Sequence, residues 1–289
     1  SDATLDIFEE FEKQYSNVRL VKVENNEAFW GNKKFALTLG IKAAKNEYLL
    51  FTDADCYPAS NEWIKEMSSQ FTMSKTIVLG YGAYEKIAKS FLNKIIRFES
   101  MLTAVQYFSW AKMKHPYMGV GRNLAYKKEE FFNVNGFIDH MKIRSGDDDL
   151  FINQASNRKN TTISFTPEGF TFSEPKKTFK EWFDQKRRHV STATFYKSFD
   201  RMQLAVFFLT QFLFILMAVI LLAFQYNWMI IVPMVVGRYI FTWVSLGYAA
   251  NKLREKDVMY WYPIIEIVLI FTQLNIFITN LFSKPVHWK

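Results

Sequence analysis

The 289-residue sequence contains a single cysteine, Cys56, so no intrachain disulfide can form. No cleavable signal peptide, internal repeat or low-complexity segment is visible in the sequence as it begins at Ser1. The first residue is Ser1 rather than Met, and a helix is expected at residues 5–15 before any strand, so we expect N-terminal sequence to be missing. The most informative absence concerns charge: within residues 204–250 the only charged residue is Arg238.

Two apolar stretches occupy this uncharged region. Residues 204–224 are long enough to cross a bilayer as a helix, and residues 229–250 form a second such stretch after a short polar break. Neither has the polar face that a soluble helix needs, which argues against a helical bundle in a soluble protein. A third stretch, residues 258–282, carries Glu266 and is either a tilted span or a partly buried helix. We therefore predict a membrane domain over 201–289 with two to three transmembrane helices.

The distribution of basic residues predicts how this domain is oriented. The formal net charge is +8, and lysine and arginine are concentrated just before the first apolar stretch and in the connector at residues 251–257. Cytoplasmic segments beside membrane helices are enriched in these residues, so we expect the preceding domain to be cytoplasmic. A full third crossing would place the basic tail, residues 284–289, on the opposite side, against the same rule. Because no separate basic patch exists, we expect no nucleic-acid partner.

Residues 1–200 predict an α/β domain that ends in an amphipathic helix. Strands and helices are expected to alternate, which implies a parallel or mixed sheet with helices on its faces. In residues 178–199 aromatic and basic side chains interleave, so this segment is expected either to lie at the membrane surface or to dock on the domain as an ordinary helix. The expected strands are residues 18–23, 47–52 and 76–81, and the further helices are residues 33–44 and 60–71.

Asp53 and Asp55 directly follow the second predicted strand, with one residue between them. Ligands of α/β sheets bind beyond the carboxyl ends of the strands. Two carboxylates at such a position can hold one Mg²⁺ or Mn²⁺ ion that is shared with substrate phosphates. The pair alone is a weak signal, because acidic pairs are frequent on loops. The adjoining Cys56 is interpreted as a small residue after a strand rather than as a nucleophile.

A second acidic cluster, Asp147-Asp148-Asp149, precedes an apolar run that predicts a helix. Mutual repulsion would raise the pKa of one of these carboxyls, which suits a general base. Acidic residues are also common at helix N-termini for reasons of the helix dipole alone. Further along, Gln185 and Arg188 belong to a basic segment in which Arg188 either stabilises a diphosphate or serves only as membrane-proximal charge.

In their order and spacing these segments resemble the family 2 glycosyltransferases, which include cellulose, chitin and hyaluronan synthases and many bacterial inverting enzymes. The resemblance covers nearly the whole chain. His189 stands where the family has the tryptophan of its Gln-x-x-Arg-Trp motif, which weakens any inference of a processive polymer synthase. The matching positions are Lys33 in a Lys-x-x-Ala-Leu segment, Asp53 and Asp55 in the Asp-x-Asp motif, Gly121–Tyr126 and Gly136-Phe137 before the acidic pair, Asp147-Asp148 in that pair, and Gln185 and Arg188 in the last motif.

The resemblance implies a GT-A fold and an enzyme that performs a single inverting displacement on a nucleotide-diphosphate sugar. A UDP-sugar is the expected donor, and Mg²⁺ or Mn²⁺ the expected cofactor. Asp149 competes with Asp148 for the role of catalytic base. The implied site residues are the metal ligands Asp53 and Asp55, the base Asp148 with Asp147 beside it, and the donor contacts Lys33, Gln185 and Arg188.

The resemblance also implies the partners and the location of the enzyme. The acceptor is expected to be a glycan or a lipid-linked molecule, membrane lipid is expected around the apolar helices, and the bacterial inner membrane is the expected compartment. The strand that opens the family's domain, with its uracil-contacting aspartate, has no counterpart in this sequence. Two other functions stay open: a non-catalytic scaffold that keeps the fold, and a membrane transporter subunit with Glu266 as its functional site.

Overall fold

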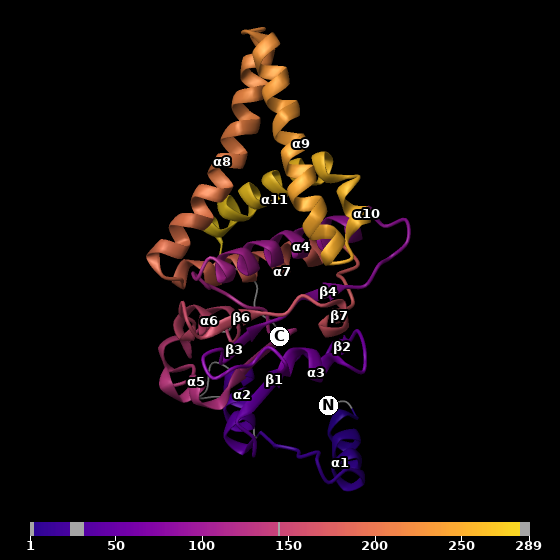
Figure 1. Ribbon diagram of the computed structural model, residues 1–289, viewed down its shortest axis with the longest axis vertical. Coiled ribbons are helices and arrows are strands. Elements are labelled where there is room, and N and C mark those ends of the chain that lie inside the picture. The colour runs from indigo at the N-terminus through magenta and orange to yellow at the C-terminus, as the bar shows by residue number, and fades with distance from the viewer. Residues whose placement is uncertain (1–2, 24–31, 144, 284–289) are drawn as a thin grey trace.

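The computed structural model describes residues 3–23, 32–143 and 145–283 (Figure 1). Its strands are β1 (Tyr48–Phe51), β2 (Cys56–Pro58), β3 (Ile77–Leu79), β4 (Gly82–Tyr84), β5 (Leu124–Lys127), β6 (Thr161–Ile163) and β7 (Thr171–Ser173). Its α-helices are α1 (Thr4–Gln14), α2 (Asn32–Ala43), α3 (Trp63–Ser68), α4 (Phe91–Lys112), α5 (Lys128–Asn133), α6 (Asp149–Ala155), α7 (Phe179–Thr192), α8 (Ser198–Ala223), α9 (Trp228–Lys252), α10 (Lys256–Met259) and α11 (Tyr262–Phe282). Short 3₁₀ helices lie at Ile138–His140, Pro167–Gly169 and Ala193–Phe195.

Two mixed sheets form the centre of the α/β domain. The larger sheet has the strand order β1-β5-β3-β6, in which β5 runs antiparallel to both neighbours and β3 runs parallel to β6. The smaller sheet has the order β2-β7-β4, with β7 antiparallel to β2 and parallel to β4. Every residue of β3 is buried, as expected for a strand that is covered on both faces. The predicted α/β class and mixed sheet are confirmed.

One predicted strand is wrong. Residues 18–23 follow α1 without forming a strand. Their polar groups find other partners: the backbone N–H of Leu20 donates to the Glu12 carboxylate at 2.8 Å, and the Arg19 guanidinium donates to the carbonyl oxygen of Ala43 at 3.2 Å. Two predicted helices are also shorter than expected, because α3 covers only part of residues 60–71 and α7 ends before the 3₁₀ turn at Ala193–Phe195.

Helices α4 and α7 form a layer between the sheets and the apolar helices (Figure 1). α7 begins with a capping box, in which the Thr178 hydroxyl accepts from the backbone N–H of Glu181 and the Glu181 carboxylate accepts from the backbone N–H of Thr178. Lys186 of α7 forms an ion pair with Glu99 of α4. The capping box fixes where α7 starts, and the ion pair holds α7 beside α4.

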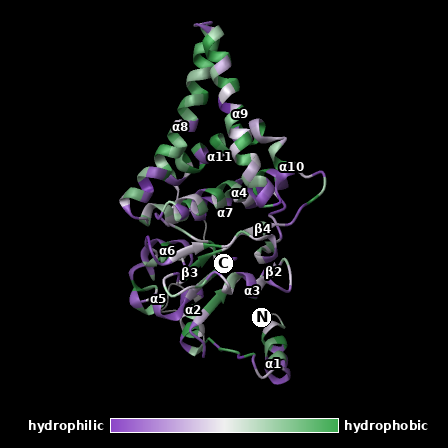
Figure 2. Ribbon diagram, in the orientation of Figure 1, coloured by the Kyte–Doolittle hydropathy of each residue, from purple (hydrophilic) through white to green (hydrophobic). Residues whose placement is uncertain are grey.

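Beyond this layer lie α8, α9 and α11, the three helices of the described residues that are long and apolar enough to cross a membrane. Figure 2 shows the hydrophobic colouring extending over these helices. α8 and α9 form a hairpin whose legs meet near residues 224–227 and diverge toward the α/β domain (Figure 1). None of the most apolar window of α8 or α9 is buried, whereas 28% of that window of α11 is. α11 runs between the legs and contacts α4, α7 and α8.

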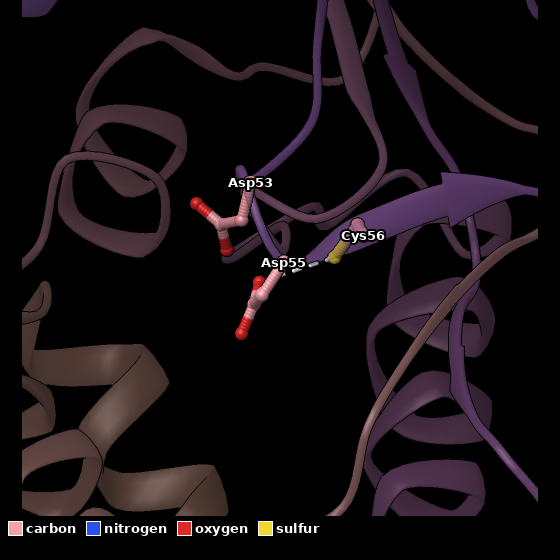
Figure 3. Close-up of side chains that lie close together, drawn as sticks. All are labelled: Asp53, Asp55 and Cys56. Atoms are coloured by element: carbon pink, nitrogen blue, oxygen red, sulfur yellow. Dashed lines mark hydrogen bonds between the residues drawn. The ribbon is translucent and has the colours of Figure 1, made fainter. Parts of the chain in front are cut away.

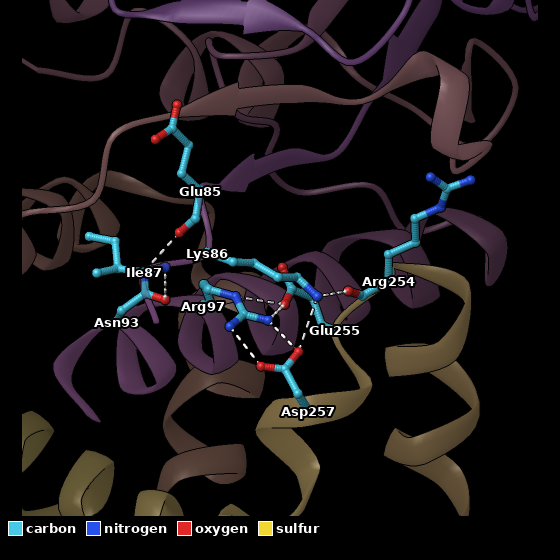
Figure 4. Close-up of polar contacts among 8 residues, drawn as sticks. All are labelled: Glu85, Lys86, Ile87, Asn93, Arg97, Arg254, Glu255 and Asp257. Carbon is cyan, nitrogen blue, oxygen red and sulfur yellow. Dashed lines mark hydrogen bonds and ion pairs between the residues drawn. The ribbon is translucent and has the colours of Figure 1, made fainter. Parts of the chain in front are cut away.

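A cluster of charged side chains joins the connector after α9 to the layer below (Figure 4). Arg97 of α4 donates from Nε to Glu255 Oε2 at 2.9 Å and from Nη1 to Asp257 Oδ2 at 2.8 Å. The side chains of Arg97 and Glu255 are each only 2% exposed. Lys86 Nζ donates to the carbonyl oxygen of Arg254 at 2.7 Å and to Asp257 Oδ1 at 3.1 Å. The hydrogen bond from Arg97 holds the pKa of Asp257 well below its usual value. This cluster ties the foot of the apolar hairpin to the α/β domain.

We expect Glu255→Gln to destabilise the protein by about 3 kcal/mol, because it leaves a buried guanidinium without its buried counter-charge. The measurement is the thermal unfolding of the detergent-solubilised protein. Glu62→Gln is the matched control, since the Lys65–Glu62 pair is exposed and such pairs contribute at most about 1 kcal/mol. Equal melting temperatures for the two variants would contradict this role for Glu255.

Candidate active site

Asp53 and Asp55 lie in the turn that follows β1. Figure 3 shows both carboxylates pointing out of this turn, with Cys56 beside them at the start of β2. One carboxylate oxygen of each aspartate and the Cys56 sulfur lie within 4.8 Å of one another. Burial raises the pKa of the Cys56 thiol, so the sulfur stays protonated at neutral pH. A protonated thiol is a poor ligand for a hard cation, whereas the two carboxylates supply the oxygen ligands that Mg²⁺ or Mn²⁺ prefers.

Lys33 connects this turn to the second acidic cluster. It lies in the first turn of α2, and its Nζ atom is 3.0 Å from Asp53 Oδ1 and 2.8 Å from Asp147 Oδ2. Burial favours the neutral amine, but the carboxylates of Asp147 and Asp53 outweigh that effect and raise the pKa of Lys33 above its usual value. Lys33 therefore stays charged and brings together two motifs that are far apart in the sequence.

Asp148 lies at the N-terminus of α6, against the backbone of Gly121. Its Oδ2 atom accepts from the Gly121 N–H at 2.6 Å, and its Oδ1 atom accepts from the Asp149 N–H at 2.8 Å. Burial and the charges of Asp147 and Asp149 raise the pKa of Asp148 to about 7, against the opposing effect of the Gly121 N–H. A Cβ atom at Gly121 would lie 3.2 Å from Asp148 Oδ2, so the glycine permits this close approach. A carboxyl group that titrates near neutrality suits general-base catalysis.

Asp149 has a different environment, although it is the next residue. Its side chain is buried, and its Oδ2 atom accepts from the Tyr196 hydroxyl at 2.7 Å and from the Thr192 hydroxyl. Its Oδ1 atom accepts from the Leu150 N–H at 2.8 Å. Burial raises the pKa of Asp149, and the two hydroxyl hydrogen bonds oppose that shift. Asp149 is buried and joins α6 to the end of α7 through two side-chain hydroxyls. Asp148 accepts only from backbone N–H groups and is partly exposed, so it is the better candidate for a base.

Lys34 organises the loop that leads to the acidic cluster. The side chain is completely buried, and its Nζ atom donates to the carbonyl oxygens of His140, Ile143 and Ser145, each at 2.8 Å. Burial lowers the pKa of Lys34 to about 8, and the nearby aspartates oppose the shift. Lys34 thus fixes the path of the chain just before the acidic pair, while the preceding lysine contacts the acids themselves.

Helix α7 passes beside the acidic cluster. Gln185, Arg188 and Thr192 follow one another at three- and four-residue spacing, so they lie along one side of the helix. Thr192 contacts Asp149, which places this side of α7 next to α6. Gln185 and Arg188 are half-buried, and burial lowers the pKa of Arg188. The structure thus brings Lys33, Asp53 and Asp147 into direct contact and places Gln185 and Arg188 on the neighbouring helix.

A family model described as glycosyl transferase family 2 matches residues 1–148, which is just over half of the chain. The chain belongs to glycosyl transferase family 2. Its α/β domain accordingly has the GT-A fold, and its class of chemistry is sugar transfer.

One solved structure and the curated proteins complete the comparison. The mannosyltransferase PcManGT from Pyrobaculum calidifontis, in complex with GDP-Man and Mn²⁺, is similar with a TM-score of 0.49 and 11% sequence identity, over 94% of this chain and 75% of that chain. No curated protein matches the chain.

Several residues that shape the site have no clear signal in the sequence. Lys34 is distinguished from Lys33 only by the direction in which it leaves α2. Thr192 and Tyr196 are ordinary polar residues until the fold places them on Asp149. Gly121 carries a weak signal, since a glycine often marks a close approach of the backbone to another group.

We expect kcat/KM to rise with pH through a midpoint of about 7, because Asp148 must lose its proton before it can act as a base. Its folded pKa is raised, so the inactive protonated form predominates below that value. Initial rates measured from acidic to alkaline pH test this expectation. The residual activity of Asp148→Asn should lack this pH dependence. A midpoint at the usual, lower pKa of an aspartate would contradict the assignment of Asp148 as the base.

Proposed function

We propose that this protein is an inverting glycosyltransferase that moves a sugar from a nucleotide-diphosphate sugar, with a UDP-sugar expected, to a hydroxyl group of a glycan or lipid-linked acceptor. The observation that carries the proposal is the convergence of Asp53 and Asp147 on Lys33, beyond the carboxyl end of β1. Family membership supports sugar transfer as the reaction class. The environments of the individual carboxylates support the roles given below.

Asp148 is the proposed base. It takes a proton from the acceptor hydroxyl while the acceptor oxygen attacks the anomeric carbon of the donor sugar. The new glycosidic bond forms as the bond to the diphosphate breaks, so a single displacement inverts the configuration. A pKa of about 7 allows Asp148 to accept this proton near neutral pH. Asp147, next to it in the sequence, forms an ion pair with Lys33.

The part of the site around Asp53 and Asp55 is suited to the departing diphosphate. Asp53 and Asp55 would hold a Mg²⁺ or Mn²⁺ ion, which supplies positive charge that neutralises the diphosphate when it is bound. Lys33 of α2 already contacts Asp53 in this turn and is the proposed contact to a phosphate oxygen. Gln185 and Arg188, on the adjacent side of α7, are the proposed further donor contacts.

The apolar helices support a membrane location. α4 and α7 separate the acidic site from α8, α9 and α11, so the site would lie close to the bilayer surface (Figure 1). The basic residues that precede α8 favour the cytoplasmic face, and the bacterial inner membrane is the expected membrane. An acceptor that is attached to lipid, or a glycan that emerges along the membrane, would meet the enzyme there.

Two rival functions make different predictions. A non-catalytic scaffold would keep the fold without turnover, which the experiments below address. In a transporter subunit, Glu266 would line a path through the membrane. In the structure Glu266 is buried, accepts from Arg238 Nη1 at 2.9 Å and accepts from the Tyr262 hydroxyl at 2.9 Å. A carboxylate that is neutralised in this way favours helix packing over transport.

Asp148→Asn is expected to reduce turnover about 10²- to 10⁴-fold, because it removes the proton acceptor. Donor affinity should stay unchanged, since the metal ligands and phosphate contacts are intact. Nucleotide release is measured on the membrane-embedded protein. Donor binding is measured by calorimetry on the detergent-solubilised protein. Asp149→Asn is the matched control. It should lower the melting temperature, while the protein that remains folded keeps most of its turnover.

Full turnover by a folded Asp148→Asn variant would remove Asp148 from the mechanism. If Asp149→Asn abolished turnover at an unchanged melting temperature, the base would be Asp149. A wild-type protein that binds a donor but never turns over, even with acceptor-containing membranes, would favour the scaffold.

Asp55→Asn is expected to weaken Mn²⁺ binding by about 10- to 100-fold, because one of two carboxylate ligands is lost. The signal of free Mn²⁺ in electron paramagnetic resonance measures this change without any need for turnover. Cys56→Ser is the control and should bind Mn²⁺ normally, since its thiol is protonated. Equal losses in both variants would indicate that the sulfur is a ligand.

A further inference from the structure

The first turn of α11 is held against α4. The Tyr262 ring lies 5.6 Å from the Phe98 ring, centroid to centroid, and Tyr262 is almost completely buried. The Trp261 ring, just before the helix, lies 5.6 Å edge-on from the Phe91 ring. Because Phe91 and Phe98 both belong to α4, the beginning of α11 is fixed at the layer that α4 and α7 form.

The last turn of α11 is held against the same layer by α7. Arg187 is buried, and its Nε atom donates to Asn280 Oδ1 at 2.9 Å. Its Nη2 atom donates to the carbonyl oxygen of Ser283 at 2.8 Å and to the Ser283 hydroxyl at 2.9 Å. Three hydrogen bonds from one buried guanidinium make this a specific attachment, which is independent of the aromatic contacts at the other end.

The length of α11 makes the two attachments informative. Its 21 residues span about 31 Å at 1.5 Å per residue. A helix of this length that stood upright in a bilayer would put its ends on opposite sides of a hydrocarbon core about 30 Å thick. Here both ends meet the layer of α4 and α7, and α11 lies across the foot of the α8–α9 hairpin (Figure 1).

The two sides of α11 differ as expected for a helix that lies along an interface. Its buried side includes Ile265, Glu266 and Ile276 and faces protein. The opposite side exposes large apolar residues, among them Phe271 (63%) and Leu281 (82%). The acidic residue of the helix is thus turned away from lipid, and an apolar stripe is left for the acyl chains.

We propose that only α8 and α9 cross the membrane, and that α11 lies in the membrane plane with Ser283 on the same side as the catalytic domain. The partner of the exposed side of α11 is the lipid bilayer. This topology rests on the membrane attachment proposed above. It also removes the conflict with the positive-inside rule that a third crossing creates.

The single native cysteine allows a direct test. In a Cys56→Ala background, Ser283→Cys, Arg254→Cys and Gln225→Cys are each expressed in membranes and treated with a membrane-impermeant maleimide, in right-side-out and inverted vesicles. Arg254 is in the connector beside the catalytic domain, and Gln225 is in the turn at the far end of the hairpin. We expect the cysteines at positions 283 and 254 to react from the same side, and the cysteine at 225 to react from the opposite side.

The controls separate this inference from the membrane proposal. Labelling of position 283 together with 225, from the side opposite to 254, would overturn the in-plane placement and show that α11 spans. Labelling of all three positions from one side would contradict insertion of the hairpin itself. A reporter domain that is active on only one side of the membrane, fused after Lys289, tests on which side α11 ends without relying on maleimide access.

Discussion

One ammonium group, that of Lys33, holds together two acidic segments that would otherwise repel each other. It lies between Asp53, after β1, and Asp147, before α6. The next residue, Lys34, points into the protein and binds the loop that carries the second acidic segment. The start of α2 therefore sets both the position of that loop and the charge balance of the site. The proposed phosphate contact and the lysine that organises the acidic loop are neighbours in the same helical turn.

The layer of α4 and α7 is held to the apolar helices by charged and polar contacts of a similar kind. Arg97 fixes the connector after α9, and Arg187 fixes the end of α11, each from a buried position on α4 or α7. Buried guanidinium groups need fixed acceptors, so these contacts are specific in position as well as favourable in energy. Helix α7, which carries the proposed donor contacts, and helix α4 are thereby attached to the long apolar helices.

Part of this arrangement can be predicted from sequence, because it depends on local pattern. An apolar strand that ends at two aspartates, and apolar stretches without a polar face, are recognisable as they stand. Residues 18–23 have the composition of a strand, but a strand needs a neighbour, and no local pattern reports that. The different environments of Asp148 and Asp149, and the inward direction of Lys34, depend on residues brought in by the fold. The path of α11 depends likewise on Arg187, since its composition alone suits a span.

The central claim is that the acidic site around Lys33 transfers a sugar from a nucleotide donor. The most direct test incubates the protein in membranes with a panel of UDP- and GDP-sugars, with Mn²⁺ and with a chelator, and measures the nucleoside diphosphate that is released. We predict metal-dependent release from one of these donors. No release from any donor, by folded protein with Mn²⁺ and a membrane acceptor present, would contradict the claim and leave a scaffold that has kept the acidic motifs without the chemistry.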